Sequence, residues 1–251
     1  MKYCVISSSS KGNCTLINYN NTSILIDFGC AKKRVVDGLA LYGLGLDDVD
    51  KLLITHSHSD HTKNIKYIPK EKYLASQNVL NEELEDNQYL FFYNEIKVGD
   101  LLITPFPLSH DAINTTGFLI KDPSGESLVY ITDTGYIKDK VLDLIKGCTY
   151  YIFESNHDTK MLYESKRDSY LISRIHSDKG HLDNVASASY LADLITDNTK
   201  EITLAHLSEE CNTPEICLKT LEKVFIDKLG GIPNIRIRCA SDTEFTKGGK
   251  Y

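Results

Sequence analysis

An apolar run and a dense group of histidines meet in one stretch, Lys51-Leu52-Leu53-Ile54-Thr55-His56-Ser57-His58-Ser59-Asp60-His61. Its first four residues have the composition of a short buried β-strand, so three imidazoles and a carboxylate follow directly after a strand end. Histidine is the commonest metal-binding side chain, and carboxylate oxygens suit hard or borderline cations. A solvated turn does not need so many ligands, and the stretch therefore predicts a metal site.

Three more candidate ligands each follow a predicted strand. They are His110 in Leu108-Ser109-His110-Asp111, Asp133 in Thr132-Asp133-Thr134-Gly135, and His206 in Leu204-Ala205-His206-Leu207. Taken singly, each has an ordinary interpretation, because a histidine after a strand is most often a surface or core residue and an aspartate before Thr-Gly often forms a turn. Their joint occurrence in this order favours metal binding.

The pattern H-x-H-x-D-H after a strand, followed by these three residues, resembles the signature of the metallo-β-lactamase superfamily. The resemblance implies an α/β fold, the four-layer αββα sandwich, with two divalent metal ions at one edge. It implies His56, His58 and His110 as ligands of the first ion, Asp60, His61 and His206 as ligands of the second, and Asp133 as the bridge. Imidazole and carboxylate without thiolate leave zinc, manganese and iron open. Two such ions can share a hydroxide of lowered pKa and stabilise both oxygens of a displacement, which suits phosphodiester hydrolysis.

The ligand set indicates which branches of the superfamily this chain does not resemble. The zinc β-lactamases usually lack the final histidine of the motif and place cysteine at the fourth position, whereas His61 and Asp133 stand here. The diiron flavoproteins have glutamate where this chain has His58, and no residues remain for a flavin domain. We therefore expect neither β-lactamase nor redox activity.

Further segments resemble the nuclease branch, and in particular the bacterial YycJ/WalJ-type exonuclease-like proteins. The similarity covers most of the chain and includes Ser7 to Asn13, Phe153 to Asp158, and Ser177 to His181. The first segment departs at Ser9, where glycine is usual, and Cys211 stands where the family tends to have asparagine. The family is associated with a cell-wall regulatory two-component system.

His181 follows a glycine at a helix entrance and is a histidine beyond the metal ligands. In ribonuclease Z-like relatives the equivalent Gly-His contacts the scissile phosphate or protonates the leaving oxygen, and imidazole suits general acid catalysis. We therefore predict Asp60 and His181 as catalytic residues, Asp60 also orienting the hydroxide.

The residues predicted to contact substrate are Ser10, Gly12, Asn13, His157 and Asn212. The serine-rich loop can offer hydroxyl and backbone N–H groups to a phosphate, and glycine permits a close backbone approach. His157 has three open roles: contacting phosphate, orienting a ligand, or capping a helix. Five cations lie between two site motifs and could neutralise phosphates or simply form a solvated face: Lys160, Lys166, Arg167, Arg174 and Lys179. Tyr163 and Tyr170 could stack on bases or belong to the core.

Length and composition limit the remaining choices. The chain has 251 residues, 41% hydrophobic and 25% charged, which excludes a disordered or collagen-like protein. Its net charge of −7 means that any polyanion must be held locally. No apolar stretch reaches the ~18 residues of a membrane span, and the N-terminal residues do not read as a signal peptide. Seven cysteines without a C-x-x-C pair favour reduced thiols, so we expect a cytoplasmic protein with no membrane partner.

Short β-runs fill the first half of the chain, and helical periodicity appears at Lys138 to Ile145, at Val185 to Ile195 and after Thr213-Pro214. Further strands are expected at Tyr150 to Phe153, Glu201 to Ala205 and Ile235 to Cys239. This order predicts two packed sheets with helices outside. Without a linker or repeat, residues 1–251 are expected to form a single metallo-β-lactamase-like domain.

These features together predict a metal-dependent phosphodiester hydrolase, and first of all a DNA exonuclease using a hydroxide that bridges two metal ions. One alternative is a hydrolase of a small phosphodiester, thioester or lactone, which the acidic net charge favours. The other is a metal-containing accessory protein of a cell-wall regulatory system. The sequence leaves DNA versus RNA, cleavage polarity and oligomeric state open.

Overall fold

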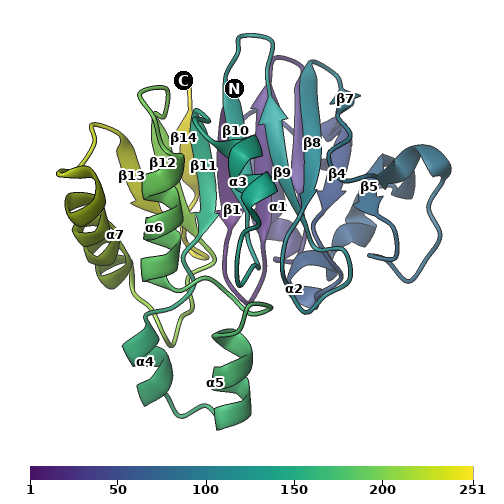
Figure 1. Ribbon diagram of the computed structural model, residues 1–251. Helices are drawn as coiled ribbons and strands as arrows, with labels where there is room; N and C mark the ends of the chain where they lie inside the picture. Colours follow the sequence, from purple (N-terminus) through teal and green to yellow (C-terminus); the bar gives the residue numbers. More distant parts are fainter. Residues whose placement is uncertain (251) are drawn as a thin grey trace. The chain divides into compact units, whose positions relative to one another are not determined.

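The computed structural model describes residues 1–250 and divides into two compact units. Unit 1 comprises Met1–Pro107, Ala112–Glu126 and residues 240–250, and unit 2 comprises Leu108–Asp111 and Ser127–Cys239. Residues 1–250 contain seven α-helices and fourteen strands, labelled in Figure 1. No helix of this part of the chain is both long and apolar enough to cross a bilayer.

Unit 1 is built on a seven-stranded sheet. In spatial order its strands are β14 (Thr246–Gly249), β1 (Lys2–Ser7), β2 (Cys14–Tyr19), β3 (Thr22–Ile26), β4 (Lys51–Ile54), β5 (Tyr73–Ser76) and β6 (Tyr89–Leu90). Strands β3 to β6 are parallel, and Ile26 pairs with Leu53. The carboxyl ends of β3 and β4 therefore come out side by side, which brings Asp27 next to Thr55. An antiparallel set, β7 (Ile96–Val98), β8 (Leu101–Pro107) and β9 (Thr116–Lys121), completes the strands of the unit.

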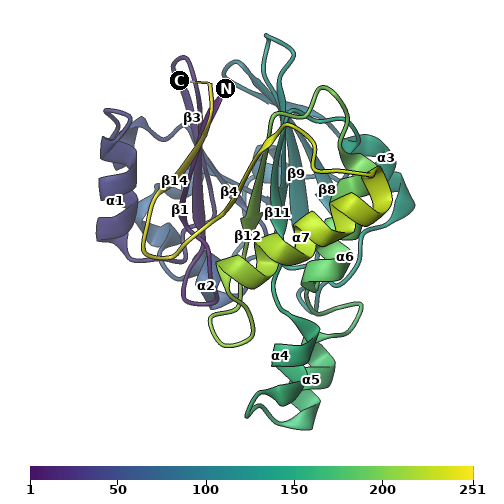
Figure 2. The same cartoon turned by 90° about the vertical axis from the view of Figure 1, so that its left-hand side faces the viewer.

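The helical elements of unit 1 are short. They are α1 (Lys32–Ala40), α2 (Ser59–Thr62), η1 (Leu46–Asp48), η2 (Ile65–Tyr67), η3 (Lys70–Lys72) and η4 (Asp86–Gln88). Helix α1 lies beside the sheet, with Val35 and Leu39 in the core cluster of its strands (Figure 2). A β-carbon on Gly38 would lie 2.8 Å from the side chain of Ile6, so this glycine lets the helix approach β1.

Unit 2 contains four parallel strands in the order β13 (Arg236–Cys239), β12 (Glu201–Ala205), β11 (Tyr150–Glu154) and β10 (Ser127–Ile131). Every residue of β11 and β12 is buried, as is typical of parallel strands covered on both faces. Phe153 pairs with both Ile131 and Leu204. The residues after these strands therefore emerge at one edge, where ligands commonly bind in parallel sheets.

The helices of unit 2 are α3 (Asp139–Ile145), α4 (Thr159–Glu164), α5 (Ser169–Ile175), α6 (Asn184–Leu194) and α7 (Pro214–Leu229). The three helices predicted from periodicity are confirmed as α3, α6 and α7, with ends shifted by about one residue. Helix α7 begins as expected, with Thr213 Oγ1 accepting from the Ile216 N–H at 3.2 Å and proline at the first position. It ends at Gly230, which has the left-handed φ of 76° that glycine accepts without strain.

Candidate metal centre

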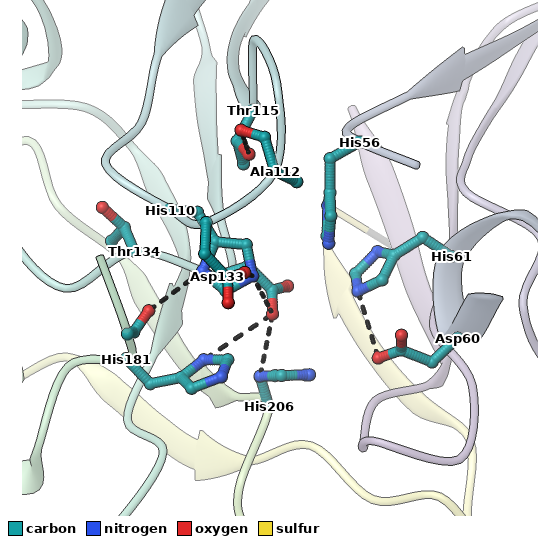
Figure 3. A network of polar contacts seen from close by, with 12 residues as sticks. His56, Asp60, His61, His110, Ala112, Thr115, Asp133, Thr134, His181 and His206 are labelled. Carbon is teal, nitrogen blue, oxygen red and sulfur yellow. Dashed lines mark hydrogen bonds and ion pairs between the residues drawn. The ribbon is translucent and has the colours of Figure 1, made fainter. Parts of the chain in front are cut away.

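Four predicted ligands of unit 1 lie on the turn after β4. His58 is the N-cap residue of α2, and the His61 N–H donates to the His58 carbonyl at 3.0 Å. This one-turn helix gathers the rings, so that His56 lies 4.2 Å from His61 and 4.6 Å from His58 between ring centroids. His56 and His61 are fully buried, while His58 and Asp60 are partly exposed. The contact between His61 and Asp60, 3.4 Å from Nε2 to Oδ2, is drawn in Figure 3.

Asp27, which the sequence analysis did not single out, orients two of these rings. Its Oδ2 lies 2.7 Å from His61 Nδ1, and its two oxygens accept from the Thr55 N–H at 2.9 Å and the Thr55 hydroxyl at 2.8 Å. The Thr55 hydroxyl in turn lies 3.0 Å from His56 Nδ1. Because a carboxylate accepts, this arrangement places the proton on Nδ1 and the electron pair on Nε2. Burial raises the pKa of Asp27, and its contacts with His61 and Thr55 oppose that shift.

The serine-rich loop of unit 1 supplies one residue to this cluster. Asn13 is fully buried, and its N–H donates to the Asp60 carbonyl at 2.7 Å while its Nδ2 lies 3.0 Å from His61 Nε2. Ser10 is exposed at the tip of the loop. A β-carbon on Gly12 would lie 2.5 Å from the Cys30 Cα, so glycine at this position allows the loop to pack against the chain. The loop thus positions Asn13 beside Asp60 and His61.

The strand ends of unit 2 bring together a second group of candidate ligands. Asp133, Glu154, His181 and His206 have ligand atoms that all lie within 4.8 Å of one another. Asp133 Oδ1 lies 3.6 Å from the Nδ1 atoms of His181 and His206, as the dashed lines in Figure 3 show. It also lies 3.9 Å from His110 Nε2. All of these residues except His181 are buried.

Glu154 is the centre of this group and was also missed by the sequence analysis. Its Oε1 lies 2.8 Å from His181 Nδ1 and 3.1 Å from His206 Nδ1. Burial alone would raise the pKa of Glu154, but the charge and hydrogen bond of His181, together with the bond from His206, lower it to about 2. A carboxylate here again places the ring protons on Nδ1. The available signal in the sequence was an acidic residue at the end of an otherwise apolar strand.

The backbone beside this group adopts an unusual conformation. Asp133 and His206 have positive φ angles of 62° and 57°, which few residues other than glycine adopt. The Asp133 N–H donates to Glu154 at 3.2 Å, and Asn156 Nδ2 donates to the His206 carbonyl at 2.8 Å. Such strained residues cluster at functional sites, held by their surroundings. Here the holding groups are Glu154 and Asn156.

His110 is fixed through its other nitrogen. Its Nδ1 lies 3.1 Å from the Gly180 carbonyl, which can only accept, so Nδ1 carries the proton. Burial lowers the pKa of His110, with the charge of Asp133 opposing this, which favours the neutral ring that binds metals. His110 thus resembles His61, His181 and His206, because its Nδ1 also faces an oxygen acceptor.

His157 and Asn212, both predicted to contact substrate, are buried in unit 2. His157 Nδ1 lies 3.3 Å from Asn156 Oδ1, and burial lowers the pKa of His157 to about 4. Asn212 Nδ2 donates to the carbonyl of Ser155 at 2.9 Å and to that of Asn156 at 3.1 Å. Its Oδ1 accepts from the Asn184 side chain at 3.0 Å. The side chain of Asn212 therefore connects the segment after β11 with the start of α6.

The two clusters share one chemical property: each has imidazoles whose Nδ1 faces an acceptor, together with an aspartate. These residues fit divalent cations of the zinc type, since a ring held in this way presents Nε2 as a ligand. A family model described as a β-lactamase superfamily domain matches residues 23–206. The chain belongs to the β-lactamase superfamily. The fold prediction is thereby confirmed, and the chain is a metal-dependent hydrolase of this superfamily.

Two curated relatives and one solved structure are similar to this superfamily member. The exodeoxyribonuclease YycJ of Bacillus anthracis is 32% identical over 243 residues, covering 92% of each chain. The exodeoxyribonuclease WalJ of Streptococcus pneumoniae serotype 2 is 32% identical over 235 residues, covering 88% of this chain and 86% of the relative. The metallo-β-lactamase fold protein YhfI of Bacillus subtilis aligns over 98% of this chain and 99% of its own, with a TM-score of 0.70 and 15% identity. The last similarity shows the fold alone.

Proposed function

We propose that the protein hydrolyses phosphodiester bonds of DNA as an exonuclease, using two divalent metal ions. Support for the substrate comes from the two relatives named exodeoxyribonucleases, which match nearly the whole chain. Support for the chemistry comes from the orientation of the histidines by Asp27 and Glu154, the observation that carries the proposal. Residues 1–251 act as one domain in this proposal, since the family match includes parts of both units.

The proposed ligands are those of the superfamily pattern. His56, His58 and His110 would hold the first ion, Asp60, His61 and His206 the second, and Asp133 would bridge them, with zinc, manganese or iron as the metal. When bound, two such ions supply a water of lowered pKa and stabilise the negative charge that develops on the phosphate. The buried carboxylate of Asp27 keeps the His61 ring aligned for this purpose.

His181 has the contacts expected of a general acid. Its side chain is 19% exposed, and its Nδ1 lies 2.8 Å from Glu154 Oε1. A carboxylate at Nδ1 fixes the orientation of the ring, so that Nε2 can face the leaving oxygen as a proton donor. Glu154 is thus a positioning residue for His181, and Asp60 a residue that orients the attacking water.

The protein is proposed to act in the cytoplasm, which is consistent with seven cysteines of which none forms a disulfide within residues 1–250. In this proposal the protein binds DNA and has no membrane partner. The acidic net charge of −7 makes a local binding surface necessary.

The test compares wild-type protein with Asp60→Ala on end-labelled single-stranded DNA, duplex DNA and RNA in manganese, magnesium or zinc. Stepwise shortening of DNA that the variant lacks is the expected result, and the label lost first gives the polarity. Metal content, measured on both proteins, serves as the control. Intact nucleic acids in the presence of bound metal would refute the nuclease, and a panel of small phosphodiesters, thioesters and lactones would then identify the rival hydrolase. Inactivity on that panel as well would favour the accessory protein.

A further inference from the structure

Helices α4 and α5 form a projection from unit 2, here called the arm and defined as residues 158–180. Both views show them extending away from the strands and from α6 and α7 (Figures 1 and 2). The base of the arm is closed by a parallel bridge between His157 and Asp183. The Asp158 N–H also donates to the Cys211 carbonyl at 2.8 Å. Both contacts attach the base of the arm to the rest of unit 2.

The arm has an apolar interior, to which Cys211 from outside the arm also belongs. Leu162, Ile175 and Cys211 are buried together, and Met161, Leu171 and Ile172 pack against them. Asp158 and Asp168 cap the two helices by accepting from backbone N–H groups at 2.9 and 2.8 Å. A β-carbon on Gly180 would lie 2.1 Å from the Ile175 carbonyl oxygen, so only glycine fits where the chain leaves the arm. These contacts make the arm a built element of the fold.

Two large aromatic side chains of the arm face solvent. Tyr163 is 59% exposed and Tyr170 is 80% exposed, so neither ring contributes much to the interior. The Tyr163 ring meets the exposed His176 edge to face, with 5.8 Å between centroids, and His176 meets the buried His157 in the same way at 5.7 Å. This row of rings holds Tyr163 at a defined place on the surface. Exposed rings on a rigid support are what base stacking requires.

Cations accompany these rings. The arm carries five lysines and arginines against four carboxylates, a net charge of +1 in a protein of net charge −7. Two of the four carboxylates are the helix caps. Lys160, Lys166 and Lys179 are exposed, and they can neutralise phosphates. The arm thus differs in charge from the protein as a whole.

The arm also leads directly to the proposed acid. Its last residue, Gly180, precedes His181, and the Gly180 carbonyl accepts from His110 Nδ1 at 3.1 Å. Arg174 of α5 pairs with Asp111, the neighbour of His110. A nucleic-acid strand whose scissile phosphate lies at His181 therefore has the arm beside its adjacent nucleotides.

We propose that the arm binds unpaired nucleotides of single-stranded DNA. Tyr163 and Tyr170 stack on bases, and Lys160, Lys166 and Lys179 contact the phosphates. Single strands fit this surface because their base faces are open, whereas a duplex presents them only at its ends. The inference rests on the proposed nuclease function and adds where the substrate is held.

The test measures binding of a 5′-fluorescein-labelled 20-nucleotide oligo(dT) by anisotropy. All proteins carry Asp60→Ala, which prevents cleavage. Removing one ring with Tyr163→Ala or Tyr170→Ala should weaken binding by roughly 5- to 150-fold. Tyr170→Phe should retain affinity because the stacking face remains. Phe91→Ala, which removes a ring that is 52% exposed in unit 1, is the matched control and should bind like the parent protein.

The lysines are tested through salt dependence. Changing Lys160, Lys166 and Lys179 to glutamine should lower the slope of log affinity against log salt by about 2, because each phosphate contact in a single strand contributes about 0.7. Circular dichroism of each variant verifies that the arm remains folded.

Three outcomes would overturn the arm proposal. Unchanged oligo(dT) affinity in both tyrosine variants, with wild-type protein still degrading DNA, would refute the arm alone. An equal loss of affinity for blunt duplex DNA would refute the single-strand assignment. Failure of the wild-type protein to bind or cleave any DNA would refute the proposed function as well.

Discussion

Replacing Glu154 by glutamine should destabilise unit 2 and disturb His181 and His206 together. Five hydrogen-bond donors converge on the two oxygens of this fully buried carboxylate. Oε1 faces Asp133 N at 3.2 Å, His181 Nδ1 at 2.8 Å and His206 Nδ1 at 3.1 Å, and Oε2 faces Thr134 N at 2.9 Å and Leu182 N at 3.2 Å. A carboxylate can accept all five, since it has about four lone-pair positions and donors can share one.

Glutamine replaces one of those oxygens by an NH₂ group. Whichever way the amide is turned, its NH₂ opposes at least two of the donors and leaves them without an acceptor. Each buried donor left unpaired costs about 1–3 kcal/mol, so the free energy of unfolding should fall by about 2–6 kcal/mol. At roughly 2–4 °C per kcal/mol for a chain of this size, the melting temperature should fall by roughly 4–24 °C.

Urea unfolding followed by far-UV circular dichroism measures this change, since the chain has no tryptophan to report by fluorescence. Glu210→Gln is the matched control. The Glu210 side chain is 70% exposed, and its Oε2 lies 3.0 Å from Arg167 Nε. Because this ion pair is largely exposed to solvent, losing the charge should cost less than about 1 kcal/mol. If the free energy of unfolding of the Glu154→Gln protein lies within about 1 kcal/mol of the wild-type value, the proposed convergence of hydrogen-bond donors on Glu154 is refuted.

Three further changes test other contacts. His157→Gln should reduce acid sensitivity: the pKa of His157 is lowered from 6.5 to about 4 in the folded protein, so the unfolded chain takes up the proton first, and stability falls by up to about 3 kcal/mol between pH 6.5 and 4. Equal pH slopes for variant and wild type in urea titrations would contradict this. Asp27→Asn should weaken metal binding by roughly 10–100-fold in calorimetry, and unchanged affinity would count against its orienting role. Gly180→Ala should open the base of the arm, because the new β-carbon meets the Ile175 carbonyl; protease resistance equal to wild type would disprove this.

The sequence predicted most strands but missed several helices, for physical reasons. Helix α1 contains Gly38 and adjacent valines, which are weak helix formers, and its N-cap Ala31 offers no side-chain hydrogen bond. Its stability comes from Val35 and Leu39 packing on the sheet, a contact invisible in the local pattern. By contrast, α7 carries its own start and stop signals in Thr213-Pro214 and Gly230 and was readily predicted.

The site divides in the same way. The candidate ligands His56 to His61 could be predicted from sequence because a one-turn helix after an apolar strand gathers residues that are close along the chain. Asp27 could not, because it reaches Thr55 only through the pairing of β3 with β4. The single-domain expectation and the assignment of ions to ligands remain predictions.

The amino-acid sequence by itself determined which types of metal-binding side chain this protein has and which strand ends they follow. Both depend only on residue type and short spacing. Only the tertiary structure decided which ring nitrogen of each candidate histidine can face a metal ion. Glu154 lies 27 residues from His181 and 52 from His206, yet one of its oxygens contacts both rings. Such a contact depends on parallel strands ending at one edge and on burial that prevents water from competing, and neither is encoded in a local stretch of sequence.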